Sequence, residues 1–316
     1  MKGTRHTRRA RTATARRRRA GSSAWASVRA QGLEILQAPS LARLPWLVHG
    51  FSTRAGGTSL LPGRSRDAGV LNLGFTDWDT RENVLAHRAK LIAALGAERM
   101  QLVTLQQIHS DAIHVLDQAP PSTLRGDAAI TRVPGLLLGV QTADCVPILL
   151  VDAVRRVVAA VHAGWRGTSR RIAAKTLGRM QMVCGTRPGD VQVAIGPAIG
   201  RCCYEVGPEV AQAYAGQFAC AGDWFDGPFE QLSSGEEPNP CKWLSRAPPG
   251  HELPAPRVQL DLVAANRWQL LDAGVKANHT VTSGLCTSCR TDLLFSYRRE
   301  GGRTGRLLAW IGIRPA

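Results

Sequence analysis

The distribution of apolar and polar positions predicts strands and helices along most of the chain. Residues 146–151 and 157–161 are apolar and rich in β-branched side chains, and the more polar residues 152–156 separate them. This pattern predicts a β-hairpin. Residues 31–57 have the pattern of short strands and a loop, and further strands are predicted at 102–105, 191–195, 279–283, 293–297 and 307–313.

Four segments have the apolar spacing and the end signals of helices. The first has Thr80 as its N-cap and Gly96 as its stop, because a hydroxyl accepts from free N–H groups and glycine tolerates a left-handed C-terminal turn. The others are predicted from about residue 169 to 185, over 208–218, and from 261 to 274. Strands and helices without strict βαβ alternation favour an α+β fold built on a large mixed sheet.

The chain has no internal repeat and no linker between two globular halves. We therefore predict a single domain over residues 31–316, preceded by a basic, disordered tail over residues 1–30. Residues 221–258 are rich in Gly and Pro and weakly patterned, so we predict a surface insertion there.

The positive charge of the chain is concentrated at its start. The formal net charge is +16, and residues 1–20 hold nine Lys and Arg residues and no acid, so the rest carries only +7. Such a segment buries too little apolar surface to fold, and we do not expect it to bind nucleic acid.

Neither a membrane nor a secretory location is indicated. No apolar stretch approaches the roughly 18–20 residues that span a bilayer, and the basic start lacks the apolar core of a secretory signal. The eight cysteines are then expected to be thiols or metal ligands in a cytoplasmic protein.

The predicted hairpin brings two metal-binding residue types together. Folding it about its turn places Cys145 across from His162, within about one residue of register, and opposed side chains lie roughly 4.5–5.5 Å apart. A thiolate and an imidazole suit Zn²⁺. His109, in QQIHSD after a predicted strand, is the third candidate, and three protein ligands leave the open position of a catalytic zinc site. Asp144 is predicted to orient an imidazole or to act as a base.

Two arginines with small neighbours are candidate anion sites. Arg166 and Gly167 lie in GWRGT, directly before a predicted helix, where free N–H groups and the helix dipole favour an anion. Arg54 lies in STRAGG, and a guanidinium suits phosphate or carboxylate. The alternative for either arginine is a surface salt bridge. The nucleotide-binding patterns GxGxxG and GxxxxGK[ST] are absent.

The remaining cysteines give weaker signals. Cys286 and Cys289 form a lone CxxC, and without a second CxxC at zinc-finger spacing we do not expect a structural zinc there. Cys202 and Cys203 are adjacent, and neighbours on a strand point to opposite faces. We therefore expect at most one of these two to serve a functional site.

Several motifs together resemble those of the laccase-domain family, whose members are also described as polyphenol oxidases, peptidoglycan editing factors or purine nucleoside phosphorylases. They are, in chain order, STRAGG, NLG at 72–74, QQIHSD, GDAAITRVPG, VQTADCVPILL, VHAGWRGT, AIGPAIGRCCYEVG, LDLVAANRWQL, GLCT and FSYRREGGRTGRLLAWIGI. The resemblance covers about residues 45–314. One departure is that the family's usual QVHG is QIHS here, which places Ser110 where glycine is usual.

The resemblance implies a layered sandwich and one zinc held by two histidines and a cysteine, which match His109, Cys145 and His162. It also implies phosphorolysis of adenosine, inosine, guanosine and S-methyl-5′-thioadenosine, together with adenosine deamination. The expected partners are purine nucleosides and phosphate, and the expected state is a monomer or a homodimer. Candidate substrate or phosphate contacts are Arg54, Asn72, Arg166 and Gly167; candidate catalytic residues are Cys145, Asp144, Arg54 and Arg166.

Three other activities are weighed against this one. A multicopper oxidase needs clustered histidines, commonly as HxH pairs, and this chain has eight histidines with no HxH pair and none beside a cysteine, so we exclude it. A cysteine-dependent amidase that edits peptidoglycan precursors is the alternative, with Cys145 as nucleophile and a histidine as base. Metal content distinguishes these two. Nucleic-acid binding by the tail is third, and deletion of residues 1–20 tests it.

Overall fold

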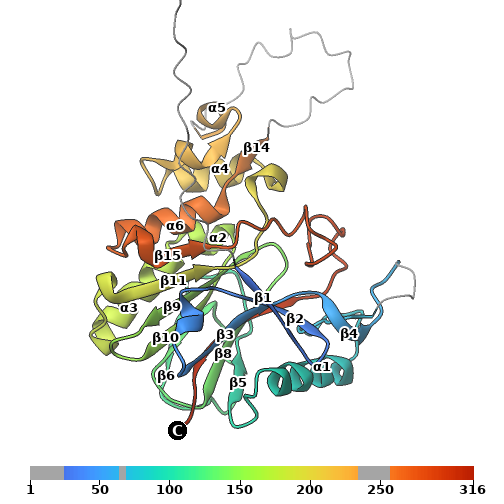
Figure 1. Cartoon of the computed structure of the whole chain (residues 1–316). Helices are drawn as coiled ribbons and strands as arrows, with labels where there is room; N and C mark the ends of the chain where they lie inside the picture. Colours follow the sequence, from blue (N-terminus) through green and yellow to red (C-terminus); the bar gives the residue numbers. More distant parts are fainter. Residues whose placement is uncertain (1–24, 64–68, 234–256) are drawn as a thin grey trace, which may run out of the picture.

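A computed structural model describes residues 25–63, 69–233 and 257–316 (Figure 1). Its α-helices are α1 (Arg81–Ala94), α2 (Trp165–Ser169), α3 (Ile172–Cys184), α4 (Pro208–Ala215), α5 (Phe229–Ser233) and α6 (Leu262–Asp272). Its strands are β1 (Ala26–Ala30), β2 (Leu33–Gln37), β3 (Leu47–Ser52), β4 (Ala55–Ser59), β5 (Gln101–Thr104), β6 (Ile113–Leu116), β7 (Ala128–Thr131), β8 (Leu136–Thr142), β9 (Val146–Asp152), β10 (Val157–Ala163), β11 (Val191–Ile195), β12 (Glu205–Val206), β13 (Phe225–Asp226), β14 (Val258–Leu260), β15 (Thr280–Thr282) and β16 (Leu307–Ile313).

Most strands belong to two six-stranded sheets. The first has the order β1-β2-β3-β16-β8-β5, and the second has the order β15-β11-β9-β10-β7-β6. The pairs β5–β8, β6–β7 and β11–β15 are parallel, and the other pairs in these two sheets are antiparallel. The predicted α+β class with mixed pairing is confirmed, with two sheets in place of one large sheet.

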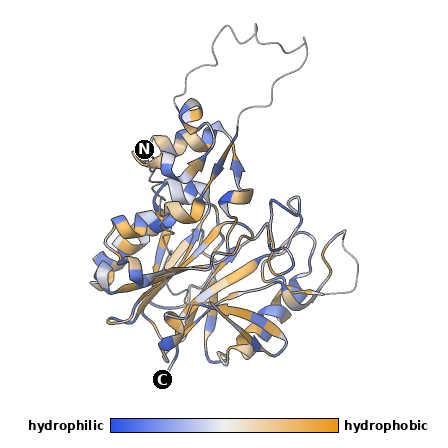
Figure 2. Ribbon diagram, turned by 45° about the horizontal axis from the view of Figure 1, so that its top comes forward, coloured by the Kyte–Doolittle hydropathy of each residue, from blue (hydrophilic) through white to orange (hydrophobic). Residues whose placement is uncertain are grey.

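The two sheets pack face to face between layers of helix (Figures 1 and 2). Along β9, Leu149 and Val151 face the first sheet, whereas Ile148 and Leu150 face the core under α3, α4 and α6. Because both faces of β9 are buried, its sequence is a continuous apolar run. On the outer face of the first sheet, Leu91 of α1 packs in a separate apolar cluster with Leu33 and Trp310. The predicted layered sandwich is therefore confirmed.

The predicted helices and their ends are largely confirmed. The Thr80 hydroxyl accepts a first-turn N–H of α1 at 3.2 Å, and Gly96 after it has a left-handed φ of 55°. Asp261 caps α6 by accepting an N–H at 2.8 Å. The helix predicted from about residue 169 is α3, which begins at Ile172, because Arg171 has a left-handed φ of 63° and separates it from the short α2.

Two predictions near the ends of the chain are wrong. Residues 26–30, predicted as part of the disordered tail, form β1, which pairs antiparallel with β2; residues 1–24 lie outside the described residues. Residues 293–297, predicted as a strand, form turns in which the Arg290 carbonyl accepts the N–H groups of Leu293 and Leu294 at 3.0 and 2.8 Å. The apolar residues there instead bury Phe295 in a small separate core.

The segment predicted as a surface insertion contributes to the core where it is described. Trp224 and Phe225 pack edge-on against Tyr214 of α4, with ring centroids 6.1 and 5.6 Å away. Strand β13 also joins β12 and β14 in a three-stranded sheet. The prediction is therefore wrong for residues 221–233, and residues 234–256 lie outside the described part of the chain.

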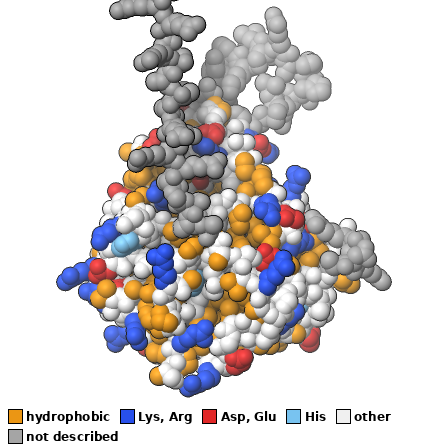
Figure 3. Space-filling model, viewed as in Figure 1, with side chains coloured by type: hydrophobic (Ala, Val, Ile, Leu, Met, Phe, Trp, Pro, Cys, Tyr) orange, Lys and Arg blue, Asp and Glu red, His pale blue; other side chains and the backbone are white. Residues whose placement is uncertain are grey.

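Within residues 25–63, 69–233 and 257–316, no helix combines the length and apolar character needed to cross a bilayer. On the face shown in Figure 3, Lys and Arg side chains are dispersed among apolar and neutral groups. The described residues visible on this face thus form no concentrated basic patch of the kind that binds nucleic acid.

Candidate metal and nucleoside site

Three predicted residues lie together at one end of the second sheet. The ligand atoms of His109, Cys145 and His162 all lie within 4.8 Å of one another. Cys145 directly precedes β9, His162 lies in β10, and His109 lies in the loop between β5 and β6. His162 is buried, Cys145 is half-buried and His109 is exposed, so the cluster can be reached from the surface.

Strand register brings two of these ligands together. His162 pairs with Pro147, and Ala163 pairs with Val146. Cys145 therefore lies two residues from direct opposition to His162, rather than within about one as predicted. Because side chains alternate with a period of two, this offset keeps both ligands on the same face of the sheet.

A glycine allows the close approach of the three ligands. A Cβ on Gly164 would lie 2.9 Å from Cδ2 of His109 and 3.0 Å from Sγ of Cys145, well inside an ordinary carbon contact of roughly 3.5–4.0 Å. His109 and Asp144 also have left-handed φ values of 55° and 95°. Such values are uncommon for non-glycine residues and cluster at functional sites.

Asp127, a residue without a predicted role, holds two of the three ligands in place. Its Oδ1 accepts from Nδ1 of His162 at 2.8 Å and from the N–H of His109 at 3.0 Å. Its Oδ2 accepts from both the N–H and the hydroxyl of Ser110 at 2.7 Å, and from the N–H of Ile108 at 3.3 Å. With Nδ1 of His162 bonded to a carboxylate, Nε2 is left as the donor to a metal, as in carboxylate–histidine–zinc sites.

Cys145, His162 and Asp127 shift one another's pKa values. Burial disfavours the Cys145 thiolate, but His162 and His109 lower the pKa of Cys145 to about 6. Burial also disfavours charge on His162, yet Cys145 and Asp127 raise the pKa of His162 to about 9. Burial would raise the pKa of Asp127, but hydrogen bonds from His162 and Ser110 lower it to about 2. In the metal-free site at neutral pH, a thiolate therefore faces an imidazolium.

The donor set fits a zinc ion. Two imidazoles and one thiolate are ligands that zinc prefers, and three protein ligands are typical of catalytic zinc. The thiol is already favoured in its ionised form, which is the form that binds metal. Asp127 supplies the hydrogen bond behind His162 that such sites commonly have.

Asp144 does not have the first of its two predicted roles, which is to orient an imidazole. It does not bond an imidazole, since its Oδ1 accepts from the Thr287 hydroxyl at 2.6 Å and its Oδ2 accepts from the Arg298 N–H at 2.7 Å. Its backbone carbonyl accepts from the N–H of Ile199 at 2.8 Å. Each carboxylate oxygen retains a second lone pair, so Asp144 keeps the capacity to accept a proton.

Asn72 positions other residues and has no amide group left for a substrate. Its Nδ2 donates to Thr76 at 3.2 Å and to Asp79 at 2.8 Å. Its Oδ1 accepts from the N–H groups of Gly74 at 3.2 Å and Arg306 at 2.9 Å. All four hydrogen-bonding positions of the amide are therefore used.

Arg54 is buried in an ion pair. Its Nη1 donates to Glu300 at 3.0 Å and to the carbonyl of Thr291 at 2.7 Å, and the two charged side chains are only 6% and 5% exposed. The guanidinium also lies 4.7 Å from the ring centroid of Phe295. This environment favours a role in holding the 290–300 turns over a direct contact with phosphate.

Arg166 is exposed, whereas Gly167 is buried. The Arg166 guanidinium lies 4.4 Å from the ring centroid of Trp165, and this exposure leaves it accessible to an anion. A Cβ on Gly167 would lie 3.1 Å from the carbonyl oxygen of Ser110. Gly167 thus lets α2 pack closely against the loop that carries His109.

Two further arginines lie near the cluster. Arg306 interacts electrostatically with Cys145. The Arg298 guanidinium lies 5.3 Å from the ring centroid of Tyr204, and the charge of Arg166 also acts on Tyr204. Arg298 and Arg306 belong to the motif FSYRREGGRTGR. That motif carries the family resemblance, which is the signal that could have identified both residues from sequence.

Comparison with known proteins identifies the family of this chain. A family model described as multi-copper polyphenol oxidoreductase laccase matches residues 48–314. The chain is 39% identical over 284 residues to a purine nucleoside phosphorylase of Deinococcus radiodurans, covering 90% of this chain and 94% of the relative. It is 36% identical over 273 residues to adenosine deaminase RL5 of an unknown prokaryotic organism, covering 84% and 93%.

A solved structure has the same fold. The crystal structure of the Bacillus licheniformis hypothetical protein YfiH superposes with a TM-score of 0.73 at 30% sequence identity. The match covers 90% of this chain and 97% of that protein, so the shared fold spans most of the chain.

Proposed function

We propose that this chain, which belongs to the family described as multi-copper polyphenol oxidoreductase laccase, is a zinc-dependent purine nucleoside phosphorylase that also deaminates adenosine. The proposed substrates are adenosine, inosine, guanosine and S-methyl-5′-thioadenosine, with phosphate. The names of the two relatives support both activities. The observation that carries the proposal is the cluster of His109, Cys145 and His162, oriented by Asp127.

The same cluster argues against copper oxidase chemistry. Within the described ranges, the side chains that could hold a metal form two groups, and the one with histidines has only two of them. The other group consists of four cysteines. Neither group offers the several imidazoles that a copper cluster for oxygen reduction requires.

His109, Cys145 and His162 would hold the zinc, which supplies Lewis acidity at neutral pH when bound. Asp127 keeps the Nδ1 proton of His162 in place and fixes the loop of His109. The ligands are thus oriented before substrate binds, so little reorganisation is needed during the reaction.

We assign proton transfer to Asp144 and phosphate binding to the arginines. In phosphorolysis, a phosphate oxygen bonds to C1′ as the C1′–N9 bond breaks, and the purine leaves with the electron pair and takes up a proton. In deamination, a water oxygen bonds to C6, the C6–N6 bond breaks, and ammonia leaves. Asp144 would carry the proton in each case, while exposed Arg166 and neighbouring Arg298 would bind phosphate.

Phosphate-dependent release of hypoxanthine from inosine tests the proposal. We expect release by the purified protein only when phosphate is present, and we expect Cys145→Ala to lose both phosphorolysis and adenosine deamination. Cys184→Ala is the matched control, because Cys184 lies at the end of α3, outside both metal-capable groups. If Cys145→Ala retains both activities, the proposed site is wrong.

The cysteine-dependent amidase is kept as a second candidate because one observation favours it. Cys145, His162 and Asp127 form a thiolate, imidazolium and carboxylate series like that of cysteine hydrolases. A nucleophilic cysteine needs only one histidine, however, and His109 faces the same sulfur. A folded, active protein without stoichiometric zinc would favour the amidase. The cytoplasmic location and the oligomeric state stay predictions.

A further inference from the structure

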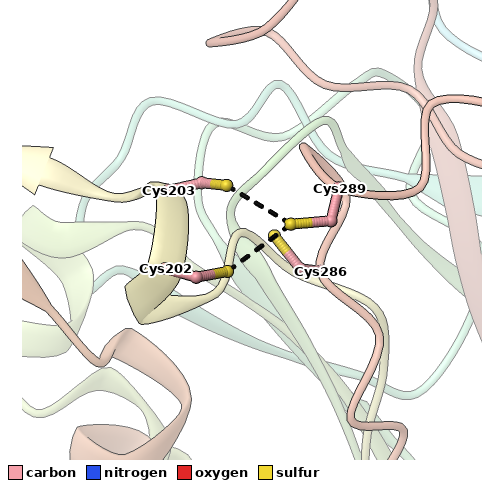
Figure 4. Close-up of side chains that lie close together, drawn as sticks. All are labelled: Cys202, Cys203, Cys286 and Cys289. Carbon is pink, nitrogen blue, oxygen red and sulfur yellow. Dashed lines mark hydrogen bonds between the residues drawn. The ribbon is translucent and has the colours of Figure 1, made fainter.

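A second cluster of metal-binding side chains lies outside the nucleoside site. The sulfur atoms of Cys202, Cys203, Cys286 and Cys289 all lie within 4.8 Å of one another (Figure 4). Cys289 Sγ is 3.6 Å from Cys202 Sγ and 3.4 Å from Cys203 Sγ. The CxxC therefore has two cysteine partners that its sequence spacing did not indicate, and the adjacent cysteines face one centre, which the expected strand geometry had excluded.

Local backbone geometry explains how adjacent cysteines face one centre. Cys202 and Cys203 lie in the 3₁₀-helix η3 (Arg201–Cys203) rather than in a strand. A 3₁₀-helix has three residues per turn, so neighbouring side chains diverge by about 120° instead of the 180° of a strand. Cys286 and Cys289 lie in the turn that follows β15, and Figure 4 shows all four sulfurs pointing toward one another.

Backbone hydrogen bonds join the two segments that carry the cysteines. Ala198 forms a parallel bridge with Cys286, and the Thr287 N–H donates to the Ala198 carbonyl at 3.0 Å. The Gly200 N–H donates to Sγ of Cys286 at 3.2 Å. A Cβ on Gly200 would lie 3.3 Å from Sγ of Cys202, so a larger residue would crowd the sulfurs.

We infer that these four cysteines form a second metal site, a closed tetrathiolate site for Zn²⁺. A Zn–S bond of about 2.3 Å places the sulfurs of a tetrahedral site about 3.8 Å apart, within the range that the cluster spans. Four protein ligands leave no open position, which is typical of a structural zinc. Burial in the apolar core does not explain the cluster, because Cys202 and Cys289 are exposed and the other two are half-buried.

The site would brace the residues around Asp144. Thr287, between the two ligands of the CxxC, donates its hydroxyl to Asp144, and Ile199, just before η3, donates its N–H to the Asp144 carbonyl. The segment after η3 carries Tyr204, against which Arg298 stacks. The metal would therefore link the two loops that hold Asp144 without touching a substrate.

Metal counting in variants tests the inference independently of any nucleoside activity. We expect protein purified under reducing conditions to hold two zinc ions per chain, Cys145→Ala to hold one, and the double variant Cys286→Ser/Cys289→Ser to hold one. Cys184→Ser and Cys220→Ser, which alter cysteines outside both groups, should still hold two. In Cys145→Ala, X-ray absorption should show sulfur alone around zinc at about 2.3 Å, without nitrogen at about 2.0–2.1 Å.

A second measurement uses the unaltered protein, in case a cysteine variant fails to fold. A mercurial reagent that captures thiolates should release both zinc ions, and chelation of zinc should expose the four cysteines to alkylation, as read by peptide mass spectrometry. Folded Cys145→Ala without zinc would overturn the inference. So would rapid alkylation of all four cysteines in the untreated protein, or a mass that shows disulfides among them.

Discussion

Replacing Asp127 with Asn tests how the nucleoside site is organised. The carboxylate accepts five hydrogen bonds, two at Oδ1 and three at Oδ2. An amide keeps only one acceptor oxygen and adds two donors. If its oxygen stays with His162, its NH₂ group faces the N–H groups of Ile108 and Ser110, which both lose their acceptor.

The expected loss follows from those bonds. Each backbone N–H left without an acceptor costs about 1–3 kcal/mol when water cannot replace it, and this loop is partly exposed, so water offsets some of that cost. The larger effect is on the metal, since removal of a hydrogen-bonding group behind a histidine ligand lowers affinity about 10–100-fold. That range corresponds to about 1.4–2.7 kcal/mol. We expect zinc affinity at the histidine site to fall by this factor.

Chelator competition on the Cys286→Ser/Cys289→Ser background isolates that site. Asp190→Asn is the matched control, because Asp190 pairs with Arg155 at 3.3 Å on the surface. Ser110→Ala gives a graded comparison, since it removes one of the five bonds and leaves the Ser110 N–H bonded to Asp127. A folded Asp127→Asn protein that binds zinc within twofold of the unaltered chain would refute the role assigned to Asp127.

Three other perturbations have defined outcomes. Gly164→Ala should abolish zinc binding at the histidine site by metal analysis, because its Cβ would lie 2.9 Å from His109 and 3.0 Å from Cys145 Sγ. The facing histidines lower the pKa of Cys145 to about 6 against the effect of burial. In zinc-stripped protein, alkylation of Cys145 by iodoacetamide should therefore increase as the pH rises through 6, not through 9. Bound zinc should block this alkylation. Arg54→Met removes the ion pair with Glu300 and leaves the Thr291 carbonyl without the Arg54 donor, so denaturant unfolding should show a loss of about 1–3 kcal/mol, whereas an unchanged stability with a raised KM for phosphate would restore the phosphate-binding role.

The parts of the site that could be predicted from sequence are local. The hairpin of β9 and β10 has a short turn and apolar strands, so Cys145 and His162 were constrained to one region by the pattern alone. An error of one residue in register would normally reverse a side chain, but the observed offset of two preserves the face. His109 could be added because a strand directly precedes its loop.

The parts that sequence could not supply depend on contacts distant in the chain. Asp127 is 18 residues from His109 and 35 from His162, and an acidic residue before a short strand has no local signature of a metal-site partner. Asn72 and Arg54 lie in motifs of the family resemblance, yet their side chains are used inside the protein. A motif identifies a constrained residue without showing whether ligand or protein imposes the constraint.

The two clusters act through different residues. Asp127, directly before β7, fixes His109 and His162, whereas the segments that carry the four cysteines contain Thr287 and Ile199, which hold Asp144. Loss of the tetrathiolate metal should therefore leave zinc affinity at the histidine site nearly unchanged and lower kcat through Asp144. Loss of Asp127 should do the reverse and lower zinc affinity first. Parallel loss of zinc affinity in both variants would mean that the two loops form one coupled unit.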